Sequence, residues 1–225
     1  MNTKSFADLG VSPVVANSLA ERGIASAFPV QASVIPDALA GHDVLVKSPT
    51  GSGKTLALGV PLVDLIDAED ARAAALVLAP TRELVSQIVE ELRPLATARA
   101  LSIAPVYGGV GIEKQAKLAR KAHIVVATPG RLEDLIQRGA VRLDRVRVLA
   151  LDEADRMLDM GFRPAVDRIV ARCPRDRQTL FFSATLAGEA GRAASASRSR
   201  FATPARRTSS SPRPGAWRIC SSAAR

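Results

Sequence analysis

The chain has 225 residues and 47% of them are hydrophobic, which suits one sizeable domain or at most two small ones. It has two cysteines, Cys173 and Cys220, which exclude a disulfide scaffold and a cysteine-rich zinc site and favour a reducing, cytoplasmic location. No apolar run approaches the roughly 20 residues that span a bilayer. Residues 1–10 also lack the apolar region of a signal peptide, so we expect no membrane association.

The net charge of +9 is unevenly distributed. Residues 186–225 hold eight arginines, no lysine and one acidic residue, so they carry +7 of that total. The remainder of the chain is close to neutral. The basic composition therefore does not, by itself, indicate that the body of the protein binds nucleic acid.

Two helical patterns precede the first expected strand. Ser12 followed by Pro13 is typical of a helix start, and Gly23 of a helix end. A second pattern covers 31–40 and stops at Gly41. We therefore assign residues 1–41 to a helical region.

From residue 42 to residue 185, short apolar runs alternate with helical patterns, which predicts a doubly wound α/β domain. The runs are apolar at successive positions, as a mostly parallel sheet with helices on both faces requires. The expected strands are 44–47, 75–79, 103–106, 124–127, 148–151 and 179–182. The expected helices include 54–66, 83–98, 112–121 and 164–172.

The character of the chain changes at Leu186. Of residues 186–225, 32 are Ala, Arg, Ser, Pro or Gly, and no segment keeps a helix or strand period. This composition predicts a disordered basic tail.

The first expected strand runs into a glycine-rich loop that precedes a helix, an arrangement that binds phosphate groups. Lys54 is expected to reach the β- and γ-phosphates, and the Thr55 hydroxyl to bind Mg²⁺. Ser48 stands where the strict pattern has glycine. The alternative is a glycine-rich turn with a surface lysine. The expected nucleotide-binding residues of the loop are Ser48, Pro49, Thr50, Gly51, Ser52, Gly53, Lys54 and Thr55.

The second motif is acidic and follows the apolar run 146–151. An acid at the carboxyl end of a buried strand lies where α/β sheets bind ligands. We expect Asp152 to hold Mg²⁺ through water and Glu153 to orient and deprotonate the attacking water, with Lys54 completing the catalytic set. The alternative is that Asp152 caps the next helix.

Beyond these two motifs, the chain resembles the DEAD-box family of ATP-dependent RNA helicases. The resemblance covers residues 5–185, the first RecA-like P-loop domain of that family. Its motifs occur in family order: Phe6 and Gln31, the phosphate loop, 80–84, Gly108-Gly109, 128–131, Asp152-Glu153-Ala154-Asp155 and Ser183-Ala184-Thr185.

The resemblance implies that Gln31 hydrogen-bonds the adenine edge of ATP and that Phe6 packs against the base. The alternative for Phe6 is an ordinary core aromatic. Ala27-Phe28 replaces the family's usual Pro-Thr, and Ile24 stands where an aromatic is frequent.

The resemblance also implies contacts with the sugar–phosphate backbone of RNA, without reading of sequence. Ser183 and Thr185 would couple the nucleotide state to RNA binding, or else simply cap the strand end. Arg82 and Arg131 have an alternative, which is pairing with acids such as Glu83 and Asp134. The expected RNA-binding residues are Thr81, Arg82, Gly109, Thr128 and Arg131.

The family's second RecA-like domain, which supplies arginines to the γ-phosphate, has no counterpart in these 225 residues. We therefore expect an RNA helicase present as its N-terminal half, with weak activity of its own. The alternatives are a truncated ATP- and RNA-binding module, and a P-loop ATPase of another type. The tail is interpreted either as an out-of-frame reading of GC-rich DNA or as a natural RNA-tethering segment.

Overall fold

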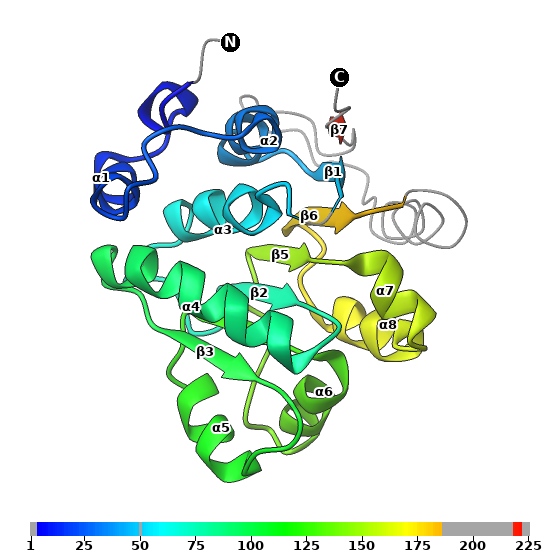
Figure 1. The fold of residues 1–225 in the computed structure, drawn as a ribbon. Coiled ribbons are helices and arrows are strands. Elements are labelled where there is room, and N and C mark those ends of the chain that lie inside the picture. The colour runs from blue at the N-terminus through cyan, green and yellow to red at the C-terminus, as the bar shows by residue number, and fades with distance from the viewer. Residues whose placement is uncertain (1–3, 50, 186–217, 222–225) are drawn as a thin grey trace, which may run out of the picture.

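Seven parallel strands form a single sheet in the computed structural model, which describes residues 4–49, 51–185 and 218–221 (Figure 1). The order of the strands across the sheet is β3-β4-β2-β5-β6-β1-β7. Every pairing in it is parallel. The strands are β1 Val44–Lys47, β2 Ala75–Leu78, β3 Ile103–Val106, β4 Ile124–Ala127, β5 Val148–Leu151, β6 Gln178–Ser183 and β7 Arg218–Ser221.

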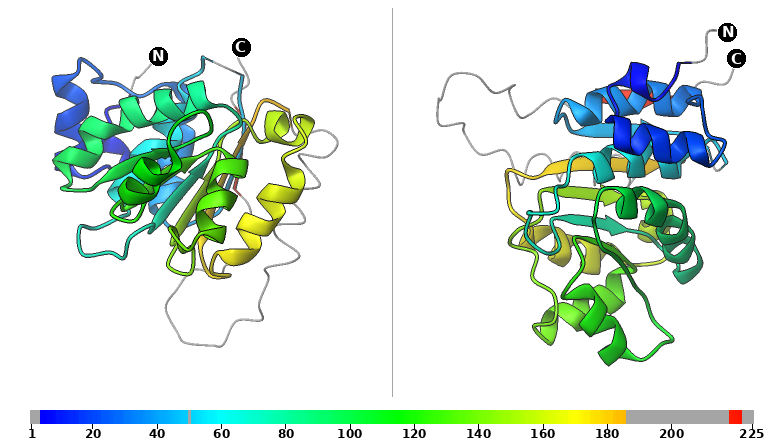
Figure 2. Two further views of the ribbon diagram at one scale, coloured as in Figure 1. Left: turned by 90° about the horizontal axis from the view of Figure 1, so that it is seen from below. Right: turned by 90° about the vertical axis from the view of Figure 1, so that its left-hand side faces the viewer.

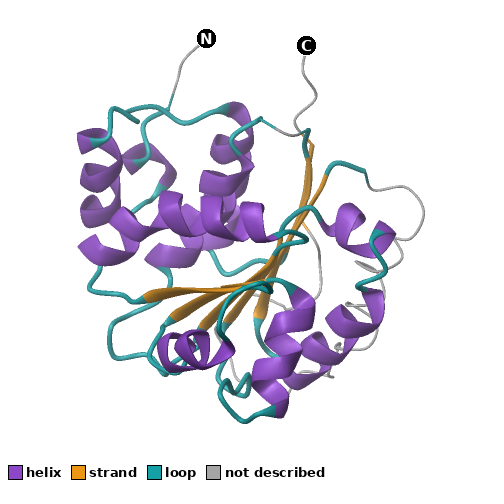
Figure 3. Ribbon diagram, turned by 60° about the horizontal axis from the view of Figure 1, so that its bottom comes forward, coloured by secondary structure: helices purple, strands orange, loops and turns teal. Residues whose placement is uncertain are grey.

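Helices cover both faces of this sheet (Figure 3). One face packs against α1 Pro13–Glu21, α2 Pro29–Leu39, α3 Lys54–Asp64 and α4 Arg82–Ala98, with the short 3₁₀ helix η1 Ala7–Leu9 beside them. The other face packs against α5 Ile112–Ala119, α6 Pro129–Gln137, α7 Ala154–Asp159 and α8 Arg163–Arg172. In the view from below, the strands run between the blue-to-teal helices on one side and the yellow helix α8 on the other (Figure 2, left).

The strands explain why the sequence gives two separate cores. Successive residues of a strand point to opposite faces of the sheet. In β2, Val77 therefore joins the core beneath α1–α4, whereas its neighbours Leu76 and Leu78 join the core on the α5–α8 side. Because β2, β4 and β5 are buried at all four positions, apolar residues are needed on both faces.

The predicted fold class is confirmed, and the six predicted strands agree with the structure to within one residue at each end. Two helices, α6 and α7, were not among the helix ranges predicted from the sequence, although a helix after Asp152 was considered. The first starts at Pro129-Gly130, a pair that resembles a turn, and is held by the buried side chains of Leu132 and Leu135. The second has six residues, too few to show a helical period.

One prediction about the tail was wrong. We assigned no element to residues 186–225, yet 218–221 form β7 beside β1, with Val44 opposite Arg218 and Val46 opposite Cys220. The main chain of β1 supplies the hydrogen-bonding partners, so pairing rather than intrinsic propensity explains this strand. The prediction of disorder for 186–217 and 222–225 lies outside the described residues.

Within the described ranges, no helix is long and apolar enough to cross a membrane. All strands are parallel, so their carboxyl ends lie along one edge of the sheet. The segments at this edge carry the predicted motifs other than Phe6 and Gln31, which precede β1 in the chain.

Candidate functional site

The carboxyl edge of the sheet divides the predicted site residues into two groups. The segments after β1, β6 and β5, three adjacent strands, carry residues 48–49 with 51–55, 183–185 and 152–155, and the prediction for Thr50 lies outside the described residues. The loops after β2, β4 and β3, also adjacent, carry residues 81–82, 128–131 and 107–109. The predicted nucleotide residues and the predicted RNA residues therefore occupy neighbouring halves of one edge.

The loop after β1 is closed by short internal hydrogen bonds. The Ser52 hydroxyl donates to Pro49 O at 2.8 Å, and the Ser48 and Ser52 hydroxyl oxygens lie 2.6 Å apart. Because the Ser52 hydroxyl donates its proton to Pro49 O, the Ser48 hydroxyl is the donor to the Ser52 oxygen. The loop curls through Gly51 and Gly53, whose φ angles of 78° and 86° favour glycine. Serine in place of glycine at position 48 thus contributes a hydrogen bond that ties the loop together.

Lys54, the first residue of α3, lies inside this loop. Its side chain is buried, with 7% of the residue exposed, and Nζ donates to Ser48 O at 2.9 Å. The loop therefore surrounds a positive charge at the amino end of a helix, where unpaired backbone N–H groups also favour anions. This burial excludes the alternative of a surface lysine.

Asp152 ends β5 and is 3% exposed. Burial raises the pKa of its carboxyl to about 6, although the positive charge of Lys54 and a hydrogen bond from the Glu153 backbone favour the ionised form. That bond joins Glu153 N to Asp152 Oδ1 at 2.9 Å. Helix α7 begins at Ala154 with Glu153 as its N-cap residue and has no side-chain capping bond, so this contact is not a helix cap; Asp152 instead places a buried carboxylate beside the lysine of the phosphate loop.

Glu153 adopts an unusual backbone conformation. Its φ of 47° lies in the left-handed region, which costs energy for a residue with a side chain. Its carboxylate pairs with Arg156 at 3.2 Å on the next helical turn. Strain of this kind persists only where the surroundings hold it, and the strained residue is the predicted base.

The predicted coupling residues, Ser183 and Thr185, contact both the phosphate loop and the acidic motif. Thr185 donates to Asp155 Oδ2 from its backbone N at 2.9 Å and from its hydroxyl at 3.1 Å. Burial acts to raise the pKa of Asp155, but these hydrogen bonds, together with those from the Arg156 backbone and the Ser183 side chain, outweigh it and lower the pKa below its ordinary value. In the same segment, Ser183 O accepts from Ser48 N at 3.1 Å. The end of β6 thus contacts both motifs directly.

Gln31 joins the start of α2 to the phosphate loop. It is 1% exposed, its Oε1 accepts from Phe28 N at 2.8 Å, and its Nε2 donates to Gly53 O at 3.1 Å. Phe6 is 2% exposed and packs in the core beneath α1–α4. This placement matches the alternative of a core aromatic and leaves Phe6 little surface for a base.

One contact near the loop, that of Glu91 with Thr55, was not foreseen from the sequence. The Thr55 side chain hydrogen-bonds the carboxylate of Glu91 on α4. Burial raises the pKa of Glu91, and the positive charge of Arg22 acts in the opposite direction. No local sequence pattern links residues 36 positions apart, so only the packing of α3 on α4 reveals this contact.

In the other half of the edge, Thr81 caps α4 by accepting from Leu84 N at 3.2 Å. Arg82 is half exposed, lies 3.8 Å from the carboxylate of Glu83, and places its guanidinium over the ring of Tyr107 at 5.9 Å. Gly109, with a φ of 83°, approaches Arg82 so closely that a Cβ there would lie 3.3 Å from its guanidinium. An exposed arginine, an aromatic ring and a bare stretch of backbone therefore lie together.

Arg131 is held more firmly than Arg82. It donates to Val110 O and to Gln115 Oε1, both at 3.0 Å, and lies 3.7 Å from Asp134. The anticipated pairing with Asp134 is therefore present, and Arg131 also ties α6 to the loop before α5. Thr128 begins α6 as its N-cap residue without a side-chain capping bond. Contact of either residue with RNA stays a prediction.

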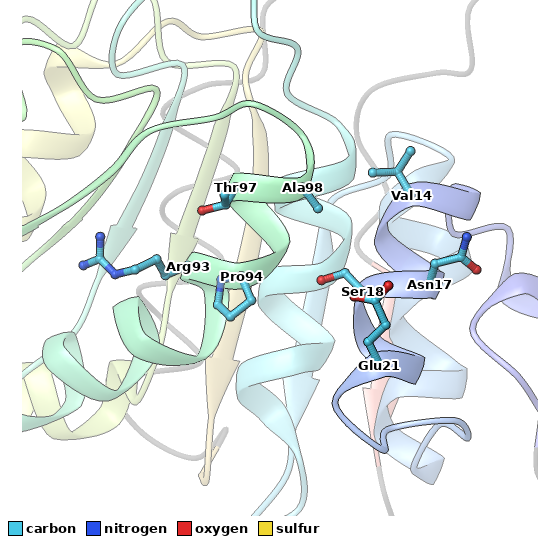
Figure 4. Close-up of a pocket in the computed structure, with 8 residues that line it drawn as sticks. All are labelled: Val14, Asn17, Ser18, Glu21, Arg93, Pro94, Thr97 and Ala98. Atoms are coloured by element: carbon cyan, nitrogen blue, oxygen red, sulfur yellow. The ribbon is translucent and has the colours of Figure 1, made fainter.

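A separate groove of about 660 Å³ lies between α1 and α4 (Figure 4). None of its lining residues belongs to a predicted motif. They are Val14, Asn17, Ser18, Glu21, Arg93, Pro94, Thr97 and Ala98. Among the described residues, no group of three or more His, Cys, Asp or Glu side chains could hold a metal ion by itself.

Comparison with known proteins gives consistent results. The model of the DEAD/DEAH box helicase family matches residues 28–193. The chain is 42% identical over 183 residues to DEAD-box ATP-dependent RNA helicase CshA of Geobacillus kaustophilus, covering 81% of this chain and 39% of that protein. It is 47% identical over 182 residues to the protein of the same name from Streptococcus pneumoniae, covering 80% of this chain and 35% of that protein.

Solved structures show the same relationship. A DEAD box protein from the hyperthermophile Methanococcus jannaschii superimposes with a TM-score of 0.84 at 33% identity, over 97% of this chain and 56% of that one. A hypothetical ATP-dependent RNA helicase from Sulfolobus tokodaii gives a TM-score of 0.78 at 32% identity, over 93% and 56%. The chain thus spans between 35% and 39% of the length of these two curated relatives.

Proposed function

Because the chain belongs to the DEAD/DEAH box helicase family, we propose that it is the ATP- and RNA-binding N-terminal part of an ATP-dependent RNA helicase. The observation that carries this proposal is the buried pair of Lys54 and Asp152. Lys54 follows β1 and Asp152 follows β5 in the chain, and only β6 separates these two strands in the sheet, so the two side chains lie close together. A charged pair of this kind beside a glycine-rich loop suits a metal-bound triphosphate.

The residues present fit ATP and Mg²⁺. Lys54 would bind the β- and γ-phosphates in place of Ser48 O, within the loop formed by residues 48–55. Asp152 and Thr55 would hold Mg²⁺, which binds oxygen ligands and keeps several waters, so a cage built wholly from protein is not needed. When bound, Mg²⁺ supplies charge neutralisation for the phosphates. A cation would also relieve the cost of burying the Asp152 carboxylate, whose raised pKa reflects that cost.

The remaining residues of this half have supporting roles. Glu153 would orient the attacking water and accept its proton. Gln31 would read the adenine edge while it keeps α2 against the loop. Ser183 and Thr185 would transmit the nucleotide state, since the end of β6 contacts Ser48 and Asp155.

RNA would lie along the neighbouring half of the edge and be held by its sugar–phosphate backbone. Exposed Arg82 and the bare backbone at Gly109 are suited to phosphate groups, and the helix starts at Thr81 and Thr128 offer N–H donors. Arg131 would support this surface from beneath, because it is 14% exposed and bonded to the loop before α5. These contacts carry no base readout, so little sequence preference is expected.

We further propose that this stretch of chain binds ATP and RNA but hydrolyses ATP slowly by itself. In the family, arginines of a second domain reach the γ-phosphate, and an arginine finger is worth about 10³–10⁵ in rate in related reactions. An ATP- and RNA-binding module with little turnover is therefore the second candidate. A cytoplasmic location is part of the proposal, supported by the unpaired, buried thiols of Cys173 and Cys220.

The test is equilibrium binding of ATP with Mg²⁺ to the 225-residue chain and to Lys54→Ala. We expect the variant to lose at least tenfold in affinity, because a buried charge–phosphate interaction is removed. Lys47→Ala is the matched control, since Lys47 is exposed at the end of β1. Equal affinities of Lys54→Ala and the parent chain would contradict the phosphate-loop assignment. Strong ATP hydrolysis stimulated by RNA would refute the slow-turnover proposal, and stimulation by DNA alone would favour another type of P-loop ATPase.

A further inference from the structure

Phe28 presents an aromatic ring to solvent beside the phosphate loop. It is the N-cap residue of α2 and is 57% exposed. Among the described residues, the other large exposed apolar side chains are aliphatic or Met: Val14, Val110, Leu118, Met160 and Ile219. An exposed aromatic ring at a ligand-binding edge therefore needs an explanation.

The ring lies directly against Gly53. A Cβ built on Gly53 would stand 2.6 Å from Cδ2 of Phe28 and 2.7 Å from Nε2 of Gln31. The Phe28 ring and the Gln31 carboxamide therefore flank the same side of this glycine, immediately before Lys54. Gly53 has a φ of 86° and no side chain, so the ring can approach the backbone of the loop.

Gln31 also fixes the position of Phe28 relative to the loop. Its Oε1 accepts from Phe28 N and its Nε2 donates to Gly53 O. The backbone of Phe28 is therefore held by the same amide that holds the loop. Phe6, the aromatic expected to pack on the base, is instead 2% exposed within the core.

We propose that Phe28 is the aromatic side chain against which the base of the bound nucleotide packs. This inference rests on the proposed function, since it assumes a nucleotide whose phosphates occupy the loop. The ring offers an apolar face next to the Gln31 amide, and a purine offers a flat π surface with polar edges. Packing of base on ring uses the face, so it strengthens binding without selecting adenine over guanine. Selection of adenine over guanine would depend instead on hydrogen bonds to the edge of the base.

The experiment separates base from phosphate. Binding of ATP, GTP and inorganic tripolyphosphate, each with Mg²⁺, is measured for the 225-residue chain and for Phe28→Ala. Stacking of one base on one aromatic side chain contributes at least about 1 kcal/mol, so we expect a loss of about 5- to 10-fold for ATP and for GTP. Tripolyphosphate affinity should stay within about twofold, because it has no base. Leu118→Ala, an exposed apolar truncation on α5, should change none of the three.

Each result decides between specific readings. Unchanged ATP affinity in Phe28→Ala, or an equal loss for ATP and tripolyphosphate, overturns the inference, since the ring would then act on nothing or on the loop alone. Parent chain that binds tripolyphosphate as tightly as ATP also overturns it. Parent chain that binds neither ligand overturns the proposed function as well.

A second variant covers the case in which Phe28→Ala unfolds. Phe28→Trp, in a chain where Trp217, the sole tryptophan, is replaced by Phe, places one fluorophore at the site. We expect ATP to quench its fluorescence and tripolyphosphate to leave it unchanged. Equal responses to both ligands would contradict base packing.

Discussion

Replacement of Asp152 by Asn should stabilise the protein while it removes the predicted metal ligand. Asp152 is 3% exposed, and burial raises the pKa of its carboxyl from 3.8 to about 6. A carboxyl with a raised folded-state pKa binds more protons when folded than when unfolded between these two values. Stability therefore falls as the pH rises from about 4 to about 6 and then levels off.

The size of the expected stabilisation follows from the change in the pKa of Asp152. A change of about two pKa units corresponds to about 3 kcal/mol of unfolding free energy at pH 7.5. Roughly half of this penalty should remain at pH 5, and little of it below pH 4. Asn keeps the size of Asp and the oxygen that accepts from Glu153 N, but it has no charge to bury. Asp152→Asn should therefore gain about 1–3 kcal/mol at pH 7.5, a gain that shrinks at lower pH.

The assay is urea unfolding at pH 7.5, 5 and 4, without added nucleotide or Mg²⁺, with the parent chain measured in parallel. Asp159→Asn is the matched control, since it removes the same charge from an exposed position on α7, and should change stability by less than about 0.5 kcal/mol. The difference between Asp152→Asn and the parent chain must depend on pH. A difference that is constant from pH 4 to 7.5, or a destabilisation at pH 7.5, would refute the argument from burial.

Two further predictions concern packing and RNA. Gly59→Ala should destabilise the chain by about 1–3 kcal/mol in urea unfolding, because its Cβ would lie 2.1 Å from the Leu92 side chain where α3 meets α4. Gly130→Ala, which meets nothing within 4 Å, should not. Arg82→Ala should weaken binding to RNAs of different sequence equally and lower the slope of log affinity against log salt by about 1, whereas Arg93→Ala, exposed on the same helix, should leave both unchanged.

The sequence predicts most of the sheet because its information is local. Each of the first six strands is a short apolar run, and each motif follows directly in the chain. Parallel pairing then brings the ends of these runs to one edge, so residues such as Lys54 and Asp152 meet although 98 positions separate them. The family resemblance, carried by motif order, is confirmed by the match over residues 28–193.

Features that depend on tertiary packing were not accessible. The strand 218–221 exists because β1 offers a parallel edge, and nothing in its composition indicates a strand. The burial of Phe6 and the exposure of Phe28 depend on how α2 and η1 pack. A sequence pattern can single out an aromatic residue, but it does not show whether that side chain is buried or exposed. The bonds from Arg131 to Val110 and Gln115 likewise depend on the approach of α5 to α6.

In the predicted phosphate site, Lys54 already interacts with other groups of the protein, and this affects how its variants behave. Lys54 Nζ bonds Ser48 O, and its charge lowers the pKa of Asp152. A triphosphate bound as proposed would therefore compete with protein groups for the same ammonium, and removal of Lys54 should have two effects. It should delete the proposed phosphate contact, and it should leave the buried Asp152 carboxylate without its cation, which would raise the pKa of Asp152 further. The energies of Lys54→Ala and Asp152→Asn should therefore not add, because in the double variant neither charge is left uncompensated.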